Sequence, residues 1–291
     1  MIAVYAPADK LNPNANTKPR SWDVYDDVEE FVEVVIKKIN EMRNRKHPTK
    51  KRKLRKEALS GNELKRVIMA VWHVCFCGIQ WRSIAYMTSI PLSTIYSFFS
   101  RWTERGLWKE LLGDLIEQWR AACGDTGCPK VLLIDSRSCR SAPTCGQRGI
   151  DGGKKIKGIK LHIAVDEHGF PEGMRISTAN VHDTNGIIPI LCSLARKGFQ
   201  GTLLGDSGYK GQRLANIAKD KGMTIASSAC GDGTNFVPDG IRWVVERSFA
   251  WLSRYRRLNT IFERTAGSLV AFVQIAFISI LSRRIARCVS Y

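Results

Sequence analysis

Two short apolar segments that each end in Asp-Ser constrain the fold of this chain more than any other feature. Residues 131–134 precede Asp135, and residues 202–205 precede Asp206. Short apolar runs that stop at a turn residue are typical of buried strands. Asp often follows a strand merely as a turn residue, so either segment alone would carry little weight. Their repetition predicts two buried strands whose carboxylates lie where a sheet opens, a favoured place for a site.

The surrounding sequence predicts further strands and then helices. Residues 159–166 alternate between apolar and polar, and residues 174–177 are expected to form their hairpin partner. Helices are expected at about 184–197 and 212–221, and a long amphipathic helix from about 241. Strands in a meander, followed by strands that alternate with helices, indicate the α/β class, with a mixed sheet flanked by helices.

The first 125 residues predict an all-α part instead. A buried helix is expected at 62–80, and two helices at 81–87 and 92–104 flank a break that contains Pro91, which is the layout of a helix-turn-helix. Two packed helices with a turn are also common without DNA. The polar positions expected to meet base edges and phosphates are Ser93, Thr94, Ser97 and Arg101.

Glycine and proline residues near 121–130 indicate a boundary between the all-α part and the α/β part. Three parts are therefore predicted. A basic arm and helix occupy residues 1–60, a helical DNA-binding module 61–125, and the catalytic domain 130–291.

The charge balance favours a polyanionic partner. The chain has 45 Lys and Arg against 27 Asp and Glu, a net charge of +18, and cations that neutralise phosphates release condensed counterions. Charge alone does not separate DNA from RNA or anionic lipid. The densest basic run, 43–56, fits a DNA-phosphate arm and a solvated linker equally well, and a nuclear-localisation signal also fits residues 50–56. Its predicted DNA contacts are Lys50, Lys51, Arg52 and Lys53.

The cysteines and the apolar segments suggest a cytoplasmic protein with no membrane partner. The nine cysteines are odd in number and show no zinc-ligand spacing, which favours a reducing compartment. The longest apolar stretch, 269–281, is well short of the roughly 20 residues that span a bilayer. It is expected to be a buried helix that closes a core.

A third carboxylate, Glu246, lies on the predicted helix that begins near 241. At 100° per residue it shares a polar stripe with Arg242, Ser253 and Arg257, while Val245, Phe249 and Leu252 form a buried stripe. An exposed i,i+4 pair with Arg242 is the alternative. The apolar character of the helix favours Glu246 pointing into a cleft.

Asp135, Asp206 and Glu246 are the candidate catalytic and metal-binding residues. Three carboxylates that meet repel one another unless cations bind between them. Mg²⁺ prefers one or two carboxylates together with waters and phosphate oxygens, so Mg²⁺ or Mn²⁺ is the expected cofactor. Two such ions about 3.5–4 Å apart activate an attacking oxygen and stabilise a leaving one in phosphodiester chemistry.

Four segments of this chain resemble the motifs of bacterial insertion-sequence transposases. They are KKIKGIKLH at 154–162, VDEHG at 165–169, DSGYKG at 206–211 and RWVVER at 242–247. The resemblance covers roughly 130–285 in the family's order, and segments at 78–82 and 99–108 also resemble the family's N-terminal helical module. It implies an RNase H-like catalytic domain with an Asp-Asp-Glu triad.

The family's triad matches Asp135, Asp206 and Glu246 in this chain. Many relatives carry Tyr three residues before the Arg that precedes the Glu, and Lys seven residues after the Glu, but here these positions are Asp239 and Ser253. The residues expected to contact DNA in this part are Lys154, Lys155, Lys157, Lys160, Tyr209, Arg242, Arg254 and Arg257.

The resemblance implies a DNA transposase that acts on double-stranded DNA in the bacterial nucleoid. Such an enzyme cuts at the terminal inverted repeats of its element, and the freed 3′-hydroxyl attacks target DNA. Two ends must be brought together, so a homodimer on DNA is expected. A DNA-binding regulator without catalysis, a nuclease that cuts without joining and an inactive copy remain alternatives, although all three carboxylates are present.

Overall fold

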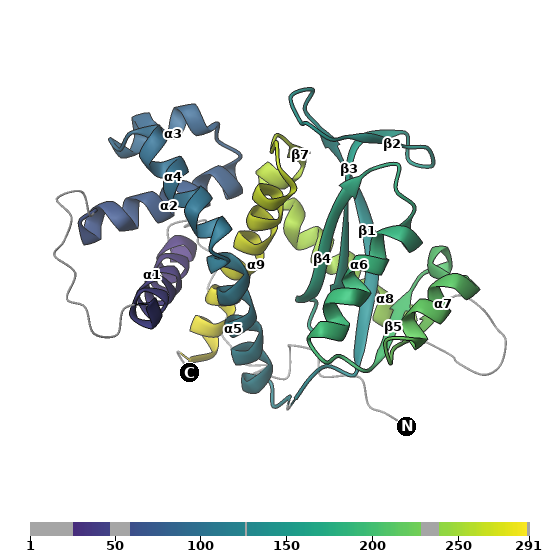
Figure 1. Cartoon of the computed structure of the whole chain (residues 1–291). Helices are drawn as coiled ribbons and strands as arrows, with labels where there is room; N and C mark the ends of the chain where they lie inside the picture. The colour runs from purple at the N-terminus through teal and green to yellow at the C-terminus, as the bar shows by residue number, and fades with distance from the viewer. Residues whose placement is uncertain (1–25, 47–58, 126, 228–238, 290–291) are drawn as a thin grey trace.

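The computed structural model describes residues 26–46, 59–125, 127–227 and 239–289. Its helices are α1 (Asp26–Lys46), α2 (Gly61–Cys77), α3 (Trp81–Thr88), α4 (Leu92–Glu104), α5 (Leu107–Ala122), α6 (Asp183–Arg196), α7 (Gln212–Lys219), α8 (Asp239–Ser253) and α9 (Ala266–Val289). Its strands are β1 (Val131–Ser141), β2 (Gly149–Asp151), β3 (Ile156–Val165), β4 (Pro171–Thr178), β5 (Thr202–Gly205), β6 (Thr224–Ser227) and β7 (Thr260–Ile261). Helices α1 to α5 lie on one side of the molecule and the sheet on the other, with α9 between them (Figure 1).

The strand order and directions confirm the expected RNase H-like sheet. Strand β1 is central, because it pairs antiparallel with β3 and parallel with β5. Strand β4 pairs antiparallel with β3, and β6 pairs parallel with β5. The order β4-β3-β1-β5-β6 therefore has an antiparallel meander followed by two parallel strands, as the meander and the later strand–helix alternation predicted.

Helices cover both faces of this sheet. The alternation of β1 places Leu132 and Ile134 in a core shared with α6 and α7, and Leu133 in the larger core shared with α8 and α9. In Figure 1 helix α6 crosses one face, and α8 is seen behind the other. Strand β1 is thus buried on both sides, which explains why its first residues are uniformly apolar.

The N-terminal helices confirm the expected helix-turn-helix-like layout. Helix α2 begins at a capping box in which Ser60 and Glu63 bond each other's backbone N–H groups. Helix α3 ends at Ser89, whose φ of 55° is left-handed, and α4 follows directly after Pro91. The sequence also predicts an acidic helix from residue 21 to about 42 with Ser21 as its N-cap, and Ser21 lies outside the described residues.

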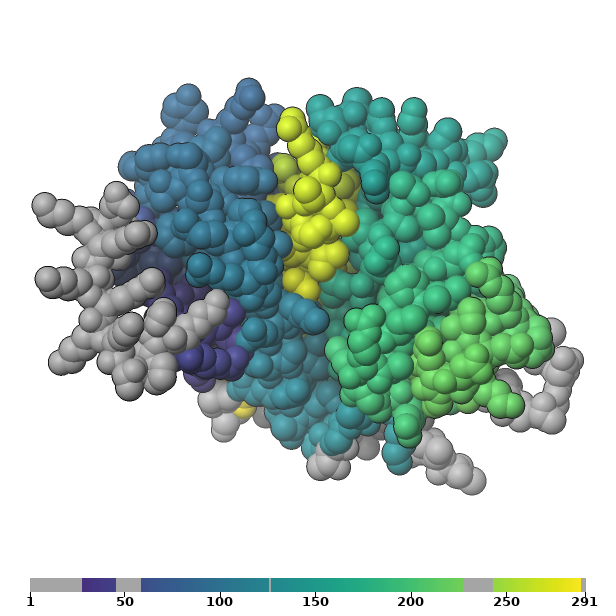
Figure 2. Space-filling model, viewed as in Figure 1, coloured from purple at the N-terminus to yellow at the C-terminus, as the bar shows by residue number. Residues whose placement is uncertain are grey.

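Helix α9 unites the helical part with the sheet. Helices α1, α2, α4 and α5 share one continuous hydrophobic core with α9 and with the β1 and β3 face that α8 covers. Figure 2 shows α9 reaching the surface between the two parts. By length and composition α9 would be able to cross a membrane, but 67% of its most apolar window is buried inside the protein. The expectation of a buried helix that closes a core is confirmed. The proposed domain limits stay predictions.

Several elements differ from the sequence prediction. Strand β1 runs to Ser141, seven residues beyond the expected end at Ile134, because Arg137 and other polar side chains interrupt its apolar run while the backbone continues to pair with β3. Helix α5 and the short strands β2, β6 and β7 were not predicted. Two- to four-residue strands are too short to show a periodicity.

Candidate active site

Asp135 lies in the middle of β1, where its carboxylate is held by the next peptide. It pairs with Ile163 of β3, and the N–H of Ser136 donates a hydrogen bond of 2.7 Å to its Oδ1 atom. Strand alternation places it on the same face as Leu133 and Arg137. That is the face covered by α8, because Arg137 Nη1 donates a hydrogen bond of 3.1 Å to the carbonyl of Phe249.

Asp206 follows β5, directly beside the segment of β1 that carries Asp135. The parallel register pairs Leu133 with Leu204, so two further residues along each strand bring Asp135 and Asp206 level. Asp206 then caps a short 3₁₀ helix, and its Oδ1 accepts a hydrogen bond of 2.9 Å from the N–H of Gly208. The two strands therefore bring these carboxylates side by side, but only Asp206 follows the end of its strand, because β1 continues past Asp135 to Ser141.

The surroundings of Asp135 disfavour the ionised form of its carboxyl group. Burial raises its pKa to about 6, and the nearby carboxylates of Asp206 and Asp183 add to that rise. The Ser136 N–H and the Lys154 ammonium act in the opposite direction. A buried carboxylate beside a second carboxylate resists ionisation, and a bound divalent cation would remove that cost. The oxygen donors present are those that Mg²⁺ and Mn²⁺ prefer.

Glu246 lies on α8, which packs against β1. Val245, Phe249 and Leu252 form the buried stripe of this helix, as expected, and Glu246 is exposed. The structure does not gather the three carboxylates into one coordination group: within the described residues, the only set of His, Cys, Asp or Glu ligand atoms within 4.8 Å of one another lies elsewhere. Asp135 and Asp206 lie at level positions of neighbouring strands, and Glu246 lies on the helix that packs against β1.

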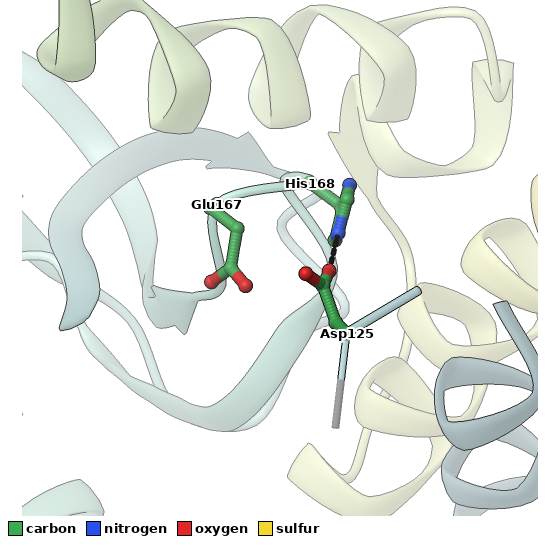
Figure 3. A group of neighbouring side chains, drawn as sticks. All are labelled: Asp125, Glu167 and His168. Atoms are coloured by element: carbon green, nitrogen blue, oxygen red, sulfur yellow. Dashed lines mark hydrogen bonds and ion pairs between the residues drawn. The ribbon is translucent and has the colours of Figure 1, made fainter. Parts of the chain in front are cut away.

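That other set is Asp125, Glu167 and His168, at the end of α5 and the turn between β3 and β4 (Figure 3). His168 Nε2 lies 2.5 Å from Asp125 Oδ2, and Arg120 Nη1 donates a hydrogen bond of 2.8 Å to Glu167 Oε1. Asp166, in the same turn, accepts hydrogen bonds from the N–H groups of His168 and Phe170. Glu167 is already bonded by the Arg120 guanidinium, and Asp125 by the His168 ring. The group is therefore a structural network that joins the end of α5 to the hairpin.

Three residues expected to contact DNA lie inside the protein, and that expectation is corrected for them. Tyr209 is buried in the core formed with α6. The ammonium group of Lys160 is buried, where it bonds Asp183 at 3.0 Å. The guanidinium group of Arg257 is also buried and bonds Glu263 at 2.7 Å. The residue types and the strand alternation predict that these three side chains face solvent. In the structure, α6 covers Tyr209 and Lys160, and Arg257 turns inward in the segment after α8.

The other expected DNA contacts are compatible with a surface role. Lys154, Lys155 and Lys157 are exposed near β2 and β3, and Arg254 is exposed after α8. On α4, Ser93, Ser97 and Arg101 are exposed and Thr94 is half-buried. The backbone of Arg242 lies in α8, but its side chain lies outside the described residues, as do Lys50, Lys51, Arg52 and Lys53.

A buried polar network lies beneath Asp135, and the sequence predictions missed it. Asp183 Oδ1 accepts hydrogen bonds from Ser136 Oγ (2.7 Å) and Lys160 Nζ (3.0 Å). Lys160 also donates to the carbonyl of Val181 at 3.0 Å. From the sequence alone, Asp183 follows a predicted strand, which fits a residue that supports the site and a loop residue equally well. Its lone signal was a position just after a predicted strand, whereas its partners are 23 and 47 residues away.

His162 lies in the same layer, and its burial predicts an acid-labile fold. Nε2 lies 2.9 Å from Ser177 Oγ, and the ring packs under Gly186 of α6. Burial lowers its pKa to about 4. Between pH 6.5 and 4 this histidine is therefore protonated in the unfolded chain but not in the folded chain. Its contribution to the free energy of unfolding is complete above pH 6.5 and is lost as the pH falls toward 4.

We expect His162→Gln to weaken this pH dependence by up to about 3 kcal/mol in unfolding free energy between pH 7 and pH 4. Denaturant unfolding at the two pH values measures it. The matched control is Asn185→Ala, at an exposed side chain of α6 that does not titrate, which should change stability equally at both pH values. An unchanged pH dependence in His162→Gln would show that this ring is not the acid-labile group.

Comparison with known proteins assigns the chain to a family. A model of the transposase DDE domain matches residues 126–234, and a second model with the same description matches 203–281. The protein assigned as transposase of insertion sequence element IS402 from Burkholderia cepacia is 31% identical over 154 residues, which cover 50% of this chain and 71% of that protein. The chain belongs to the insertion-sequence transposases of the DDE type.

Matches to solved structures are more distant. The catalytic core domain of BIV integrase is 14% identical, with a TM-score of 0.32, over 50% of this chain and 82% of the other. A piggyBac transposase in a synaptic complex with hairpin DNA is 12% identical, with a TM-score of 0.42, over 92% of this chain and 73% of the other. The family assignment rests on the sequence matches.

Proposed function

We propose that this DDE transposase cuts DNA at the ends of its own element and transfers the freed 3′-hydroxyl into target DNA, with Asp135, Asp206 and Glu246 holding Mg²⁺ or Mn²⁺. The observation that carries the proposal is the pair of carboxylates at level positions along the adjacent parallel strands β1 and β5, one of them with a pKa raised to about 6. The DDE family implies divalent-metal use, and the choice of Mg²⁺ follows from the oxygen donors.

The chain's own groups orient this site. The Ser136 N–H fixes the Asp135 carboxylate, and the Gly208 N–H fixes that of Asp206. Arg137 joins β1 to α8 through the Phe249 carbonyl, three residues after Glu246. We propose that cation and DNA binding draw Glu246 toward the two aspartates. A bound divalent cation would polarise the phosphodiester and stabilise charge on the leaving oxygen.

Two transfers on phosphorus make up the proposed reaction. Water first displaces the 3′-oxygen at the element end, which leaves a 3′-hydroxyl and a 5′-phosphate. That 3′-hydroxyl then attacks a target phosphodiester, so that a new bond joins element to target while a target 3′-hydroxyl is released. The exposed basic residues of the β2–β3 region and of α4 would hold the two DNA segments. Two ends react together, so we propose a homodimer on DNA in the bacterial nucleoid.

The experiment that tests this function is incubation with duplexes that carry the element's own ends, a target plasmid and Mg²⁺. Cut ends and joined products are both expected, and neither should form in EDTA. Cutting without joining would instead support a simple nuclease. DNA binding without either product would support the regulator or an inactive copy.

A further inference from the structure

One buried carboxylate closes the turn between β3 and β4, residues 166–170 (the β3–β4 turn). Asp166 Oδ1 accepts hydrogen bonds from the N–H groups of His168 (3.0 Å) and Phe170 (2.8 Å), and the Gly169 N–H donates to the Asp166 carbonyl at 3.0 Å. Asp166 has no exposed surface. Gly169 has a φ of 88°, in the left-handed region that favours glycine. The turn therefore has one defined shape, and it can hold the elements that contact it in fixed places.

Helix α5 of the helical part is fixed to one side of this turn. Arg120 is buried, and its Nη1 donates a hydrogen bond of 2.8 Å to Glu167 Oε1 and lies 3.5 Å from Asp166 Oδ2. Just after α5, Asp125 Oδ2 lies 2.5 Å from His168 Nε2 (Figure 3). A buried ion pair is costly to break from one side, because the partner's charge stays buried without compensation. The end of α5 and the β3–β4 turn are therefore expected to move together.

Helix α8 is fixed to the same turn at two successive carbonyl groups. Arg247 Nη2 donates a hydrogen bond of 2.9 Å to the His168 carbonyl, and Ser248 Oγ donates one of 2.7 Å to the Gly169 carbonyl. The two backbones are in close contact, since a Cβ atom added at Gly169 would lie 2.7 Å from Ser248 Oγ. Both donors follow Glu246 directly along α8. The position of the turn thus sets the position of the part of α8 that carries Glu246.

A series of cation–ring contacts joins the same three elements and adds α9. The Arg247 guanidinium lies over the rings of Trp243 and Trp251 of α8, at 4.3 and 4.8 Å from their centroids. Arg284 of α9 lies over the Trp251 ring at 4.3 Å and over the Trp119 ring of α5 at 5.6 Å. Contacts of this kind are strongest when the cation is shielded from water. Helices α5, α8 and α9 therefore converge at the β3–β4 turn.

We propose that Arg120 and Arg247 are positioning residues for Glu246: through the β3–β4 turn, α5 of the helical part holds α8 where the Glu246 carboxylate can reach the metal site. The role assigned to Glu246 rests on the proposed function. A side chain on a helix reaches only as far as its rotamers allow, and a misplacement of about 1 Å can slow a reaction about 100-fold. The helical part would then contribute to catalysis through this contact, in addition to any DNA that it binds.

Hydrogen exchange followed by mass spectrometry, on the whole protein without DNA or metal, tests the hold on α8. Arg120→Gln should raise the exchange rate of α8 amides about 10-fold, which corresponds to one hydrogen bond to a charged group. Arg247→Gln should do the same, and Ser248→Ala should act in the same direction with a milder change. Amides of α6, which lies in the other core of the sheet, should stay within about 2-fold.

Arg45→Gln is the matched control for Arg120→Gln. Arg45 Nη1 donates a hydrogen bond of 3.0 Å to Glu110 Oε2 of α5, so the substitution breaks another Arg–Glu contact of the same helix, far along it from the turn. Exchange in α8 should not change. Unchanged exchange in α8 with Arg120→Gln, Arg247→Gln and Ser248→Ala alike would overturn the inference, and so would an equal rise in all peptides in each of them.

Cleavage kinetics test the link from this hold to Glu246. Arg120→Gln should raise the Mg²⁺ concentration for half-maximal cleavage about 10-fold while DNA affinity in a gel-shift assay stays unchanged. In a Glu246→Gln background, Arg120→Gln should slow the residual cleavage by less than about 3-fold, because the ligand that it positions is gone. Fully additive effects would contradict the positioning role. If the wild type cut no DNA while exchange in α8 changed as expected, the proposed function would fail and the hold on α8 would stand.

Discussion

Asp135→Asn, Asp206→Asn and Glu246→Gln are each expected to lower Mg²⁺-dependent cleavage of element ends by on the order of 10³-fold or more. Each change removes one anionic ligand while it keeps the size of the side chain. A metal ion contributes several kcal/mol of charge stabilisation in such reactions, and about 1.36 kcal/mol is a factor of ten in rate. Single-turnover cleavage of end-labelled duplexes measures the loss.

DNA binding separates a lost ligand from a lost fold. All three variants should bind the same duplex with nearly wild-type affinity in a gel-shift assay without divalent metal. Asp220→Asn is the matched control, because Asp220 is an exposed carboxylate at the end of α7, and its rate should stay within about 3-fold of the wild type. A variant that cuts at the full rate would remove its residue from the mechanism.

Trp72→Ala is expected to lower the free energy of unfolding by about 3–5 kcal/mol. Trp72 is completely buried between α2 and α9, its Nε1 donates a hydrogen bond of 2.9 Å to Ser279 Oγ, and its ring stacks on Phe76 with centroids 4.6 Å apart. The substitution leaves a large cavity and a buried hydroxyl without its donor. Denaturant unfolding measures the change, and the thermal midpoint should fall by roughly 10 °C.

The form of the transition is as informative as its midpoint. Because α1, α2, α4 and α5 share one core with α9 and the sheet, Trp72→Ala should unfold in one cooperative step at a lower midpoint. Tyr86→Ala is the control, since this aromatic side chain is 92% exposed and its loss should change stability by less than about 0.5 kcal/mol. Two separate transitions, of which only one moves, would show that the helical part folds independently.

The strands near Asp135 and Asp206 could be predicted because their physical cause is local. Strand β5 has the predicted limits, and α4 runs from Leu92 to Glu104 as expected. A buried strand requires a run of apolar residues, and an amphipathic helix requires an apolar stripe along one face. Both patterns can be recognised in the sequence within a few residues. The rule that sites lie where parallel strands end predicts the position of Asp206, whereas Asp135 lies within β1, which continues to Ser141.

The errors arose where distant segments decide the environment of a side chain. Lys160 was expected on a polar strand face, but α6 covers that face and Asp183 becomes its partner. Arg257 was placed on the stripe of Glu246, but α8 ends at Ser253 and the guanidinium turns inward to Glu263. Asp151 bonds Ser138 and lies 3.6 Å from the Lys160 ammonium, and both partners approach it only in the folded sheet. No local pattern carries that information.

The central claim is that Asp135, Asp206 and Glu246 hold the divalent ion, and localised backbone cleavage by Fe²⁺ tests it most directly. Fe²⁺ takes oxygen and nitrogen ligands as Mg²⁺ and Mn²⁺ sites do, and with ascorbate and peroxide it produces radicals that cut the nearest peptide bonds. With DNA bound, mass spectrometry should find cuts near residues 135, 206 and 246, which excess Mg²⁺ suppresses and which Asp135→Asn loses. Cuts confined to the surroundings of Asp125, Glu167 and His168, or cuts that persist in Asp135→Asn, would contradict the account.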